Sequence, residues 1–248
     1  MDLGIKGRKA IVCAASQGLG KACAMALARE GVDVLINGRD AETLAQTADE
    51  IRAAAPGVEV TMVVGDITKP DTRAAVIGAQ PAPDILINNA GGPPPGDFRD
   101  WAREDWIAAL DANMLTAVDL IRLSLDGMMD RGFGRIVNIT SSSVRVPIPV
   151  IGLSSAARAG LTGFVLGLVP QVSAKGVTIN NLLPGPFDTN RLRNSKDITR
   201  HLTTNRVAGR VGDPAELGAM CAFLCGSQSG YVTGQNILMD CGLYPGNF

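Results

Sequence analysis

The stretch AIVCAASQGLGKACAMALA, residues 10–28, decides the fold that we expect for this chain. A short apolar run at residues 10–13 leads into a turn that carries Gly18 and Gly20, and a helical pattern follows from Lys21. Backbone amides at the start of such a helix, together with the helix dipole, attract anionic groups such as phosphates. The turn therefore predicts a nucleotide-binding site, although a simple tight connection between a strand and a helix has the same pattern.

Further along the chain, short apolar runs alternate with helical patterns. We expect strands at residues 32–36, 59–64, 85–87, 135–139, 177–183 and 236–239, and helices at 21–30, 41–55, 106–129, 155–174 and 215–224. Strands that are apolar throughout are typical of a parallel sheet buried on both faces, and right-handed crossovers then produce a doubly wound sheet. The chain is predicted to be a single α/β Rossmann domain, residues 1–248, with a parallel sheet of about seven strands and helices on both faces.

The composition is that of an ordinary soluble protein. Of the 248 residues, 46% are hydrophobic and 19% charged, and the formal net charge is −1. This balance predicts no nucleic-acid partner, and the lack of an apolar run of ~20 residues predicts no membrane span. The N-terminus has no signal-peptide core, so we expect a cytoplasmic protein with reduced cysteines. No Cys-x-x-Cys pair occurs and His201 is the single histidine, so no metal site is expected.

The end of the second predicted strand distinguishes between two dinucleotides. Asn37-Gly38-Arg39 places an arginine, and no carboxylate, where Rossmann proteins read the ribose. Because a guanidinium fork suits a 2′-phosphate, NADP(H) is favoured over NAD(H). The alternative is that Arg39 is a solvated residue that opens a loop.

These motifs resemble, in order, those of the short-chain dehydrogenase/reductase family. That family has Gly-x-x-x-Gly-x-Gly at the first turn, where this chain keeps Gly18 and Gly20 but has Ala14 in place of the first glycine. The most specific match is the tetrapeptide Asn88-Asn89-Ala90-Gly91 after the fourth strand. Within the family, the chain is most similar to the 3-oxoacyl-acyl carrier protein reductase group.

The resemblance implies a set of cofactor-binding residues at the carboxyl ends of the strands. They are Ala14, Ser16, Gln17, Gly18, Leu19, Gly20, Arg39, Asp66, Ile67, Asn89, Ala90, Gly91, Arg158, Pro184, Gly185, Phe187 and Thr189. In the family, the residue that matches Asp66 contacts the adenine, and the segment that matches Thr189 contacts the nicotinamide.

The resemblance also implies catalytic positions. In the family a serine holds the substrate oxygen, a tyrosine transfers the proton, and a lysine lowers the pKa of that tyrosine. Ser141 matches the serine, and Asn113 matches a helix asparagine that holds a relay water. The next helix places Ser154 at the tyrosine and Arg158 at the lysine, four residues apart on one helical face.

These two substitutions change the available chemistry. A serine hydroxyl is a far weaker acid than a phenol, whose pKa is about 10, and an arginine does not release a proton at neutral pH. The family's usual mechanism therefore cannot run with this pair.

Three functions are compatible with the substitutions. In the first, the protein is an atypical oxidoreductase in which another acid, such as a water held by Asn113 and Ser141, replaces the tyrosine, and Arg158 stabilises an alkoxide. In the second, it is a nucleotide-binding pseudoenzyme or sensor without redox turnover. In the third, the fold serves mainly as a partner in an oligomer. We favour the first because the serine, the asparagine and most cofactor positions are kept.

A basic segment matches the family's mobile substrate flap, residues 189–210. It carries Arg191, Arg193, Lys196, Arg200, Arg206 and Arg210 against Asp197, and Arg145 is a further cation near the serine run. This charge predicts an anionic ligand, such as a carboxylate, a phosphate, coenzyme A or an acyl carrier protein, and the alternative is a solvated basic surface or an interface. Family members are commonly tetramers built through two long helices, here starting near Trp106 and Ser155. The resemblance thus implies a homo-tetramer or homo-dimer, although the apolar residues of these helices also fit simple core burial.

Overall fold

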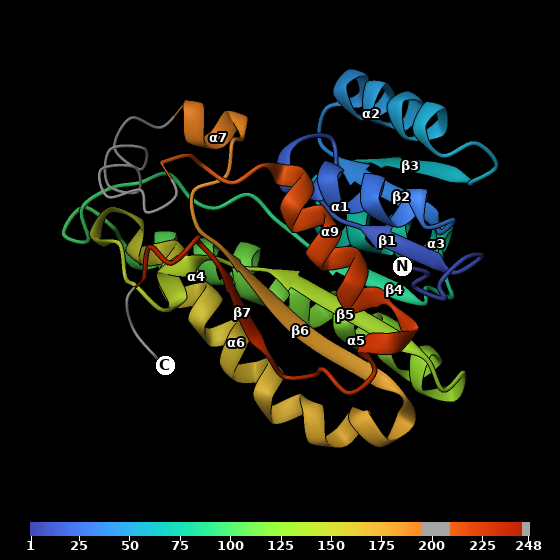
Figure 1. The fold of residues 1–248 in the computed structure, drawn as a ribbon. Helices are drawn as coiled ribbons and strands as arrows, with labels where there is room; N and C mark the ends of the chain where they lie inside the picture. The colour runs from blue at the N-terminus through green and yellow to red at the C-terminus, as the bar shows by residue number, and fades with distance from the viewer. Residues whose placement is uncertain (195–208, 245–248) are drawn as a thin grey trace.

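The protein forms one parallel sheet with helices on both faces (Figure 1). The computed structural model describes residues 1–194 and 209–244. The strands are β1 Lys9–Val12, β2 Asp33–Gly38, β3 Val60–Val64, β4 Ile85–Asn88, β5 Gly134–Ile139, β6 Val177–Pro184 and β7 Asn236–Met239. Their order in the seven-stranded sheet is β3-β2-β1-β4-β5-β6-β7, and every neighbouring pair is parallel. The predicted doubly wound α/β fold is confirmed.

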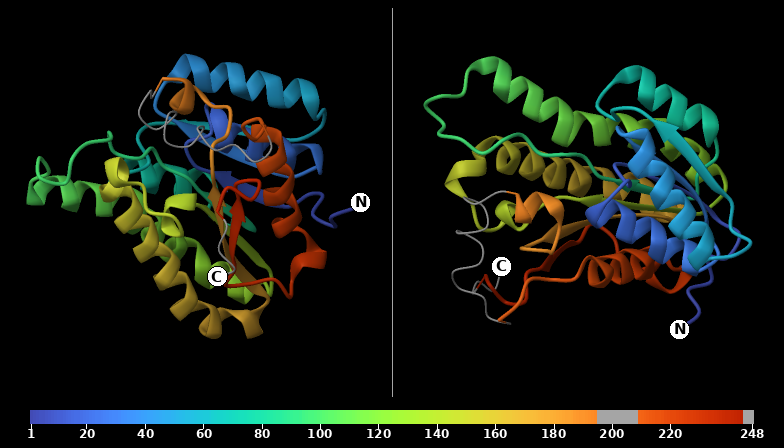
Figure 2. Two further views of the ribbon diagram at one scale, coloured as in Figure 1. Left: turned by 60° about the vertical axis from the view of Figure 1, so that its left-hand side comes forward. Right: turned by 90° about the horizontal axis from the view of Figure 1, so that it is seen from above.

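Helices cover both faces of this sheet. They are α1 Gly18–Arg29, α2 Ala41–Ala54, α3 Pro70–Ala79, α4 Arg103–Leu110, α5 Thr116–Asp130, α6 Gly152–Val172, α7 Asn190–Arg193 and α9 Pro214–Cys225. One face packs against α1, α2 and α9, and the other against α3, α5 and α6 (Figure 2). Within β1, Ala10 and Val12 enter the first core and Ile11 the second. Because successive strand side chains point to opposite faces, burial on both faces requires a run that is apolar throughout.

The strand order places a crevice at the centre of the sheet. The chain runs outward from β1 through β2 to β3, then returns to β4 on the other side of β1. Connections that leave β1 and β4 in opposite directions open a crevice at the carboxyl ends of these strands, which is where open α/β sheets bind ligands.

A π-helical turn, η1 Asp111–Leu115, separates α4 from α5. The expected single helix at 106–129 is therefore three elements in the structure. Turns of this kind often occur at functional sites because they re-aim a side chain. Here the turn carries Asn113, which is buried.

The helix α6 and its flanking turns, Pro149–Lys175, are long and apolar enough to cross a membrane by length and composition alone. In the structure α6 packs against β6, α4 and η1, and it carries the buried Arg158 in its interior. The core helices of soluble proteins can have the same length and composition, so this feature is weak evidence of a membrane span.

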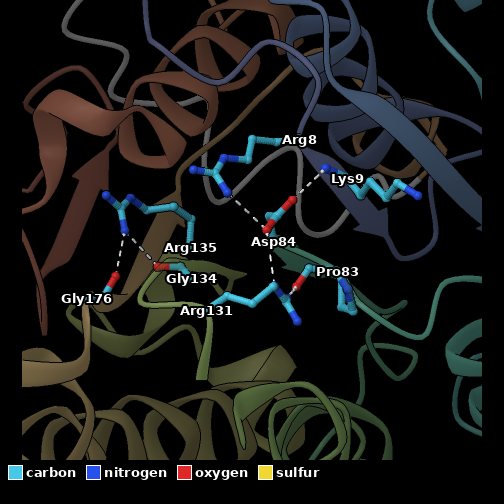
Figure 3. A network of polar contacts seen from close by, with 8 residues as sticks. All are labelled: Arg8, Lys9, Pro83, Asp84, Arg131, Gly134, Arg135 and Gly176. Atoms are coloured by element: carbon cyan, nitrogen blue, oxygen red, sulfur yellow. Dashed lines mark hydrogen bonds and ion pairs between the residues drawn. The ribbon is translucent and has the colours of Figure 1, made fainter. Parts of the chain in front are cut away.

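Asp84 lies at the amino ends of the strands, opposite the crevice at their carboxyl ends, and contacts several basic residues (Figure 3). Its carboxylate accepts hydrogen bonds from Arg8 Nη1 at 3.3 Å and from the Lys9 amide at 3.1 Å, and Arg131 Nε lies 3.6 Å away. Asp84 is buried, whereas the two arginine side chains are partly exposed. The cluster ties β1 to β4 and the end of α5.

We expect Asp84→Asn to lower the free energy of unfolding by about 1–3 kcal/mol. The amide keeps the shape of the side chain but leaves Arg8 and Arg131 without their shared counter-charge. Urea denaturation followed by circular dichroism measures the loss. The control is Asp97→Asn, an exposed carboxylate paired with Arg99, for which we expect a change within about 0.5 kcal/mol. Equal losses for both variants would show that the Asp84 cluster does not stabilise the fold.

Candidate active site

The turn between β1 and α1 is shaped for an anionic group. A Cβ at Gly20 would lie 2.4 Å from Ala14 O and 2.9 Å from Asn89 Nδ2, and Asn89 Nδ2 donates a hydrogen bond to Ala14 O at 3.2 Å. This contact joins the connections that leave β1 and β4. Gln17, the N-cap of α1, makes no side-chain capping bond, so the cap does not occupy the amides of the first helical turn. The turn fits the diphosphate that the motif predicts.

The backbone of this turn is left-handed at two positions. Ala14 has φ 46° and Gly18 has φ 59°. Glycine adopts such angles freely, whereas an alanine there costs about 1–2 kcal/mol. The structure thus accommodates Ala14 in place of the family's first glycine by holding a strained residue in the turn.

The carboxyl ends of β2 and β3 bring a cation close to a carboxylate. Asp66 accepts hydrogen bonds from the amide and hydroxyl of Thr68, at 3.0 and 2.9 Å. Partial burial raises the pKa of Asp66, but these bonds and the charges of Arg39 and Lys69 outweigh burial and bring the pKa below its usual value. Asp66 is therefore an ionised acceptor at neutral pH, next to Arg39.

Four asparagines in register form a hydrogen-bonded row across β4, β5, β6 and β7. Asn88 Nδ2 donates to Asn138 Oδ1 at 2.8 Å, and Asn138 Nδ2 donates to Asn181 Oδ1 at 2.9 Å. Asn181 Nδ2 completes the row with a bond to Asn236 Oδ1 at 2.8 Å. Motif reasoning does not anticipate this row, although an asparagine inside each of four apolar strands is a signal for it. The row ends at Asn88 Oδ1, which has no partner among the described residues.

A small cavity is lined by Asn88 at the end of this row. It measures about 20 Å³, and its lining includes Asn89, Ala90, Asn113, Thr116 and Arg158. Thr116 Oγ1 is a second buried oxygen without a partner in the part of the chain that the structure describes. A water needs roughly 10–15 Å³ and two or more polar partners. The cavity therefore has the size and polarity to hold one water molecule.

Asn113, Ser154 and Arg158 form a continuous chain of hydrogen bonds. Arg158 Nε donates to Ser154 Oγ at 3.0 Å, and Ser154 Oγ donates to Asn113 Oδ1 at 3.2 Å. Asn113 Nδ2 then donates to Gly91 O at 2.9 Å. All three side chains are buried. The Ser154 hydroxyl thus both accepts and donates within this chain.

Arg158 is the buried cation of the site. Its Nη1 donates to the carbonyls of Ile139 and Thr140 at 2.7 and 3.0 Å, and its Nη2 donates to Ala90 O at 3.2 Å. These bonds join the carboxyl ends of β4 and β5. Burial, and to a smaller extent the charge of Arg191, lowers the pKa of Arg158 to about 10, so the guanidinium stays protonated at neutral pH.

Ser141 and the segment after β6 complete this edge of the sheet. Ser141 Oγ accepts a hydrogen bond from the Ser143 amide at 3.1 Å, a geometry that leaves its O–H to donate. Thr189 caps α7, and its Cγ2 would lie 3.5 Å from a Cβ at Gly18. The start of α7 therefore lies next to the turn between β1 and α1. The neighbouring predicted contacts Pro184, Gly185 and Phe187 belong to the same segment.

The structure places most of the predicted site residues at the carboxyl edge, but it divides the basic flap. Arg193 pairs with Asp188, and Arg210 pairs with Glu216. Arg191 instead donates to two backbone carbonyls after β4. Four charged flap residues lie outside the described residues: Lys196, Asp197, Arg200 and Arg206.

Comparison with known proteins identifies the family. The family model described as enoyl-(acyl carrier protein) reductase matches residues 13–244. The chain belongs to the short-chain dehydrogenase/reductase (SDR) family. The match covers the glycine turn after β1, the hydrogen-bonded residues Asn113, Ser154 and Arg158, and the last strand of this SDR, so the resemblance inferred from its motifs is confirmed.

Relatives of this SDR match it over nearly their whole length. Acetoacetyl-CoA reductase of Allochromatium vinosum is 33% identical over 244 residues, which cover 96% of this chain and 98% of the relative. The 3-oxoacyl-[acyl-carrier-protein] reductase of Vibrio cholerae is 30% identical, and the match covers 98% of this chain and 99% of the relative. L-sorbose reductase from Gluconobacter frateurii, whose structure was solved with NADPH and L-sorbose, has a similar fold with a TM-score of 0.91 and 27% sequence identity. The superposition covers 99% of this chain and 100% of the reductase chain. This SDR is an oxidoreductase and resembles the 3-oxoacyl-acyl carrier protein reductase group.

Proposed function

We propose that this SDR transfers hydride between NADP(H) and the carbonyl or alcohol carbon of a small molecule, by a proton route that uses no tyrosine. The observation that carries the proposal is that a turn suited to the coenzyme and polar residues suited to proton transfer lie at the same edge of the sheet. The glycine turn with its close Gly20–Ala14 approach fits a diphosphate. Ser141 follows β5, Asn113 lies in η1, and Arg158 of α6 donates to the carbonyls of Ile139, Thr140 and Ala90 just after β5 and β4. When bound, the coenzyme would supply the hydride.

Support for NADP(H) over NAD(H) comes from the end of β2. A Cβ at Gly38 would lie 2.9 Å from Ser16 Cβ, so a carboxylate side chain has no room at the position that would read a 2′-hydroxyl. Arg39 follows directly and is exposed, which suits a 2′-phosphate. The L-sorbose reductase of similar structure was solved with NADPH.

We expect Arg39→Gln to weaken NADPH binding about tenfold or more and to change NADH binding little, because a bond to a charged phosphate contributes about 1.5–3 kcal/mol. Calorimetry with both coenzymes measures the two changes. Lys69→Gln removes a neighbouring charge near Asp66 and is the control. If Arg39→Gln weakens both coenzymes equally, Arg39 does not read the 2′-phosphate.

The proton would reach the substrate oxygen through water and Ser141. The water-sized cavity is lined by Asn113 and Arg158, and also by Asn88 and Thr116, whose buried side-chain oxygens lack protein partners in the described chain. Ser154 has its donor and acceptor directed to Asn113 and Arg158, so we assign it the role of holding this pair in place. The fixed positive charge of Arg158 would stabilise negative charge on the substrate oxygen.

We also propose that this SDR assembles into a dimer or tetramer and works in the cytoplasm. Exposed leucines lie on α4, η1, α5 and α6, which pack against one another: Leu110, Leu115, Leu123 and Leu166. Exposed apolar side chains that gather on neighbouring helices often mark an interface. The five cysteines are free thiols in the structure, as a reducing compartment favours.

A hydride-transfer assay tests the proposed function. The protein is mixed with NADPH and a panel of small ketones and aldehydes, and the loss of NADPH fluorescence is followed. We expect slow, enzyme-dependent oxidation of NADPH that is abolished in Ser141→Ala. Alcohols are tested in parallel with NADP⁺. Binding of NADPH without turnover of any ketone, aldehyde or alcohol would instead support a nucleotide-binding sensor, the second function that the missing tyrosine allows.

A further inference from the structure

Residues 90–93, directly after β4, present four consecutive carbonyl groups to side chains from three separate elements. The first two carbonyls accept hydrogen bonds from Arg158 of α6 and Asn113 of η1. The next two accept from Arg191 of α7, whose Nη1 and Nη2 donate at 3.1 and 3.3 Å. Consecutive Cα atoms are about 3.8 Å apart, so these bonds anchor the guanidinium groups of Arg158 and Arg191 close together at the carboxyl edge. The helix α7 lies beyond the strand ends there (Figure 1).

These two cations have no acidic partner among residues 1–194 and 209–244. The hydrogen-bond partners of Arg158 and Arg191 are neutral oxygens. Arg193, two residues further along the same helix, instead forms a two-pronged ion pair with Asp188 at 2.7 Å. The charge of Arg191 contributes to the lowered pKa of Arg158, so the two guanidinium groups repel each other. An anion placed beside them would relieve this repulsion.

Carbonyl partners alone do not indicate an anion site in this fold. Arg135, at the opposite edge of the sheet, is buried and donates to the carbonyls of Gly134, Gly176 and Gly226. It differs from Arg191 because it lies at the amino ends of the strands, away from the predicted ligand crevice, and is buried. Arg191 is exposed and uses one N–H of each Nη on the backbone, which leaves Nε and the outer N–H groups to bind a ligand.

Arg191 is also held in position. The next residue, Leu192, packs in an apolar cluster with Ile148 and Ile151, and Thr189 caps the helix. A pre-positioned guanidinium loses less conformational freedom when it binds a planar carboxylate. The carbonyl anchors and the apolar cluster therefore make Arg191 a fixed donor at the carboxyl edge of the sheet, where hydride transfer is proposed.

We propose that Arg191 binds a carboxylate of the substrate, with the buried charge of Arg158 strengthening the attraction, so that this SDR acts on oxo acids and hydroxy acids in preference to neutral ketones and alcohols. The inference rests on the proposed function. In the reducing direction the carbonyl carbon gains a hydride from NADPH and its oxygen gains a proton, giving the hydroxy acid and NADP⁺, and the carboxylate is unchanged.

The test compares short oxo acids with their methyl esters, 4-oxopentanoate and its ester among them. Binding of each probe to the protein is measured by calorimetry, with and without saturating NADP⁺, and NADPH oxidation is measured separately. We expect the acids to bind about ten times more tightly than the esters. Arg191→Gln should remove most of this preference, whereas Arg193→Gln, which loses a charge already paired with Asp188, should keep it.

Equal binding of acids and esters across the panel would overturn the inference, as would equal effects of the Arg191 and Arg193 substitutions. Failure of every probe to bind at ten-millimolar levels would also overturn it. These outcomes are distinct from failure of the proposed function. A protein that reduces neutral ketones without preferring acids retains the proposed function and loses only the inference, whereas one that binds acids through Arg191 but does not oxidise NADPH loses the proposed function.

Discussion

Replacing Gly20 with alanine is expected to abolish measurable NADPH binding by this SDR. The new Cβ would lie 2.4 Å from Ala14 O and 2.9 Å from Asn89 Nδ2. The carbonyl of Ala14 is held by the Asn89 side chain, so the start of α1 must move away from β1 to relieve the contact. Such a movement displaces the amides that would hold the diphosphate.

Calorimetry with NADPH, beside circular dichroism to verify folding, measures this effect. Gly78→Ala is the matched control, because Gly78 lies in α3 and a Cβ there meets nothing within 4 Å. We expect this control to bind NADPH as the parent does and to raise the free energy of unfolding by about 0.5–1 kcal/mol. A folded Gly20→Ala protein that binds NADPH with unchanged affinity would show that the diphosphate does not rest on this turn.

The double substitution Ser154→Tyr with Arg158→Lys is expected to raise the rate of ketone reduction by about 10²–10⁴-fold, the typical contribution of a positioned general acid. The two positions share one face of α6, and Arg158 Nε already contacts Ser154 Oγ at 3.0 Å. A lysine at 158 would place an ammonium next to the new phenol and lower its pKa. The rate of NADPH oxidation with a generic ketone is the measurement.

Two controls locate the source of such an increase. Each single substitution should give a smaller gain, because a phenol without the lysine keeps a high pKa and a lysine without the phenol supplies no equivalent acid. Adding Ser141→Ala to the double variant should remove the gain. If the double variant binds NADPH like the parent and reduces no ketone, the absent tyrosine and lysine are not the only obstacle to turnover.

Much of the fold is predictable because both faces of the sheet are buried. The last strand, β7 Asn236–Met239, has the bounds expected from its apolar run, and β6 and β3 differ by a single residue at one end. The helix α3 is absent from the sequence-based expectation. Val76 is its one fully buried residue, so the segment shows no helical period of apolar residues for a pattern to detect.

The candidate site is predictable where local motifs define it, and less so where side chains from distant elements meet. Gly18, Gly20 and Asn89 follow from short motifs. The row of asparagines depends on the register between four strands, which a single run of sequence does not contain. The bonds from Arg158 to the ends of β4 and β5 depend in the same way on where α6 lies over the sheet. Position in the chain identified Arg158, but tertiary packing determines its partners.

The flap illustrates a further limit. Its arginines are equivalent in a charge count, yet Arg193 and Arg210 are paired with carboxylates and Arg191 is anchored to the carbonyls of residues 92–93. Composition alone predicts a basic surface or an anion site for all of them. Only the pairing of each side chain in the structure separates the two interpretations.

Isothermal titration of the unmodified protein with NADPH, and in parallel with NADH, tests the central claim that a dinucleotide lies across the carboxyl edge of this sheet. The predicted result is saturable heat with NADPH at one site per chain and weaker binding of NADH. Absence of heat with either coenzyme at millimolar concentration would contradict it, and the parallel sheet would then be a scaffold for another activity.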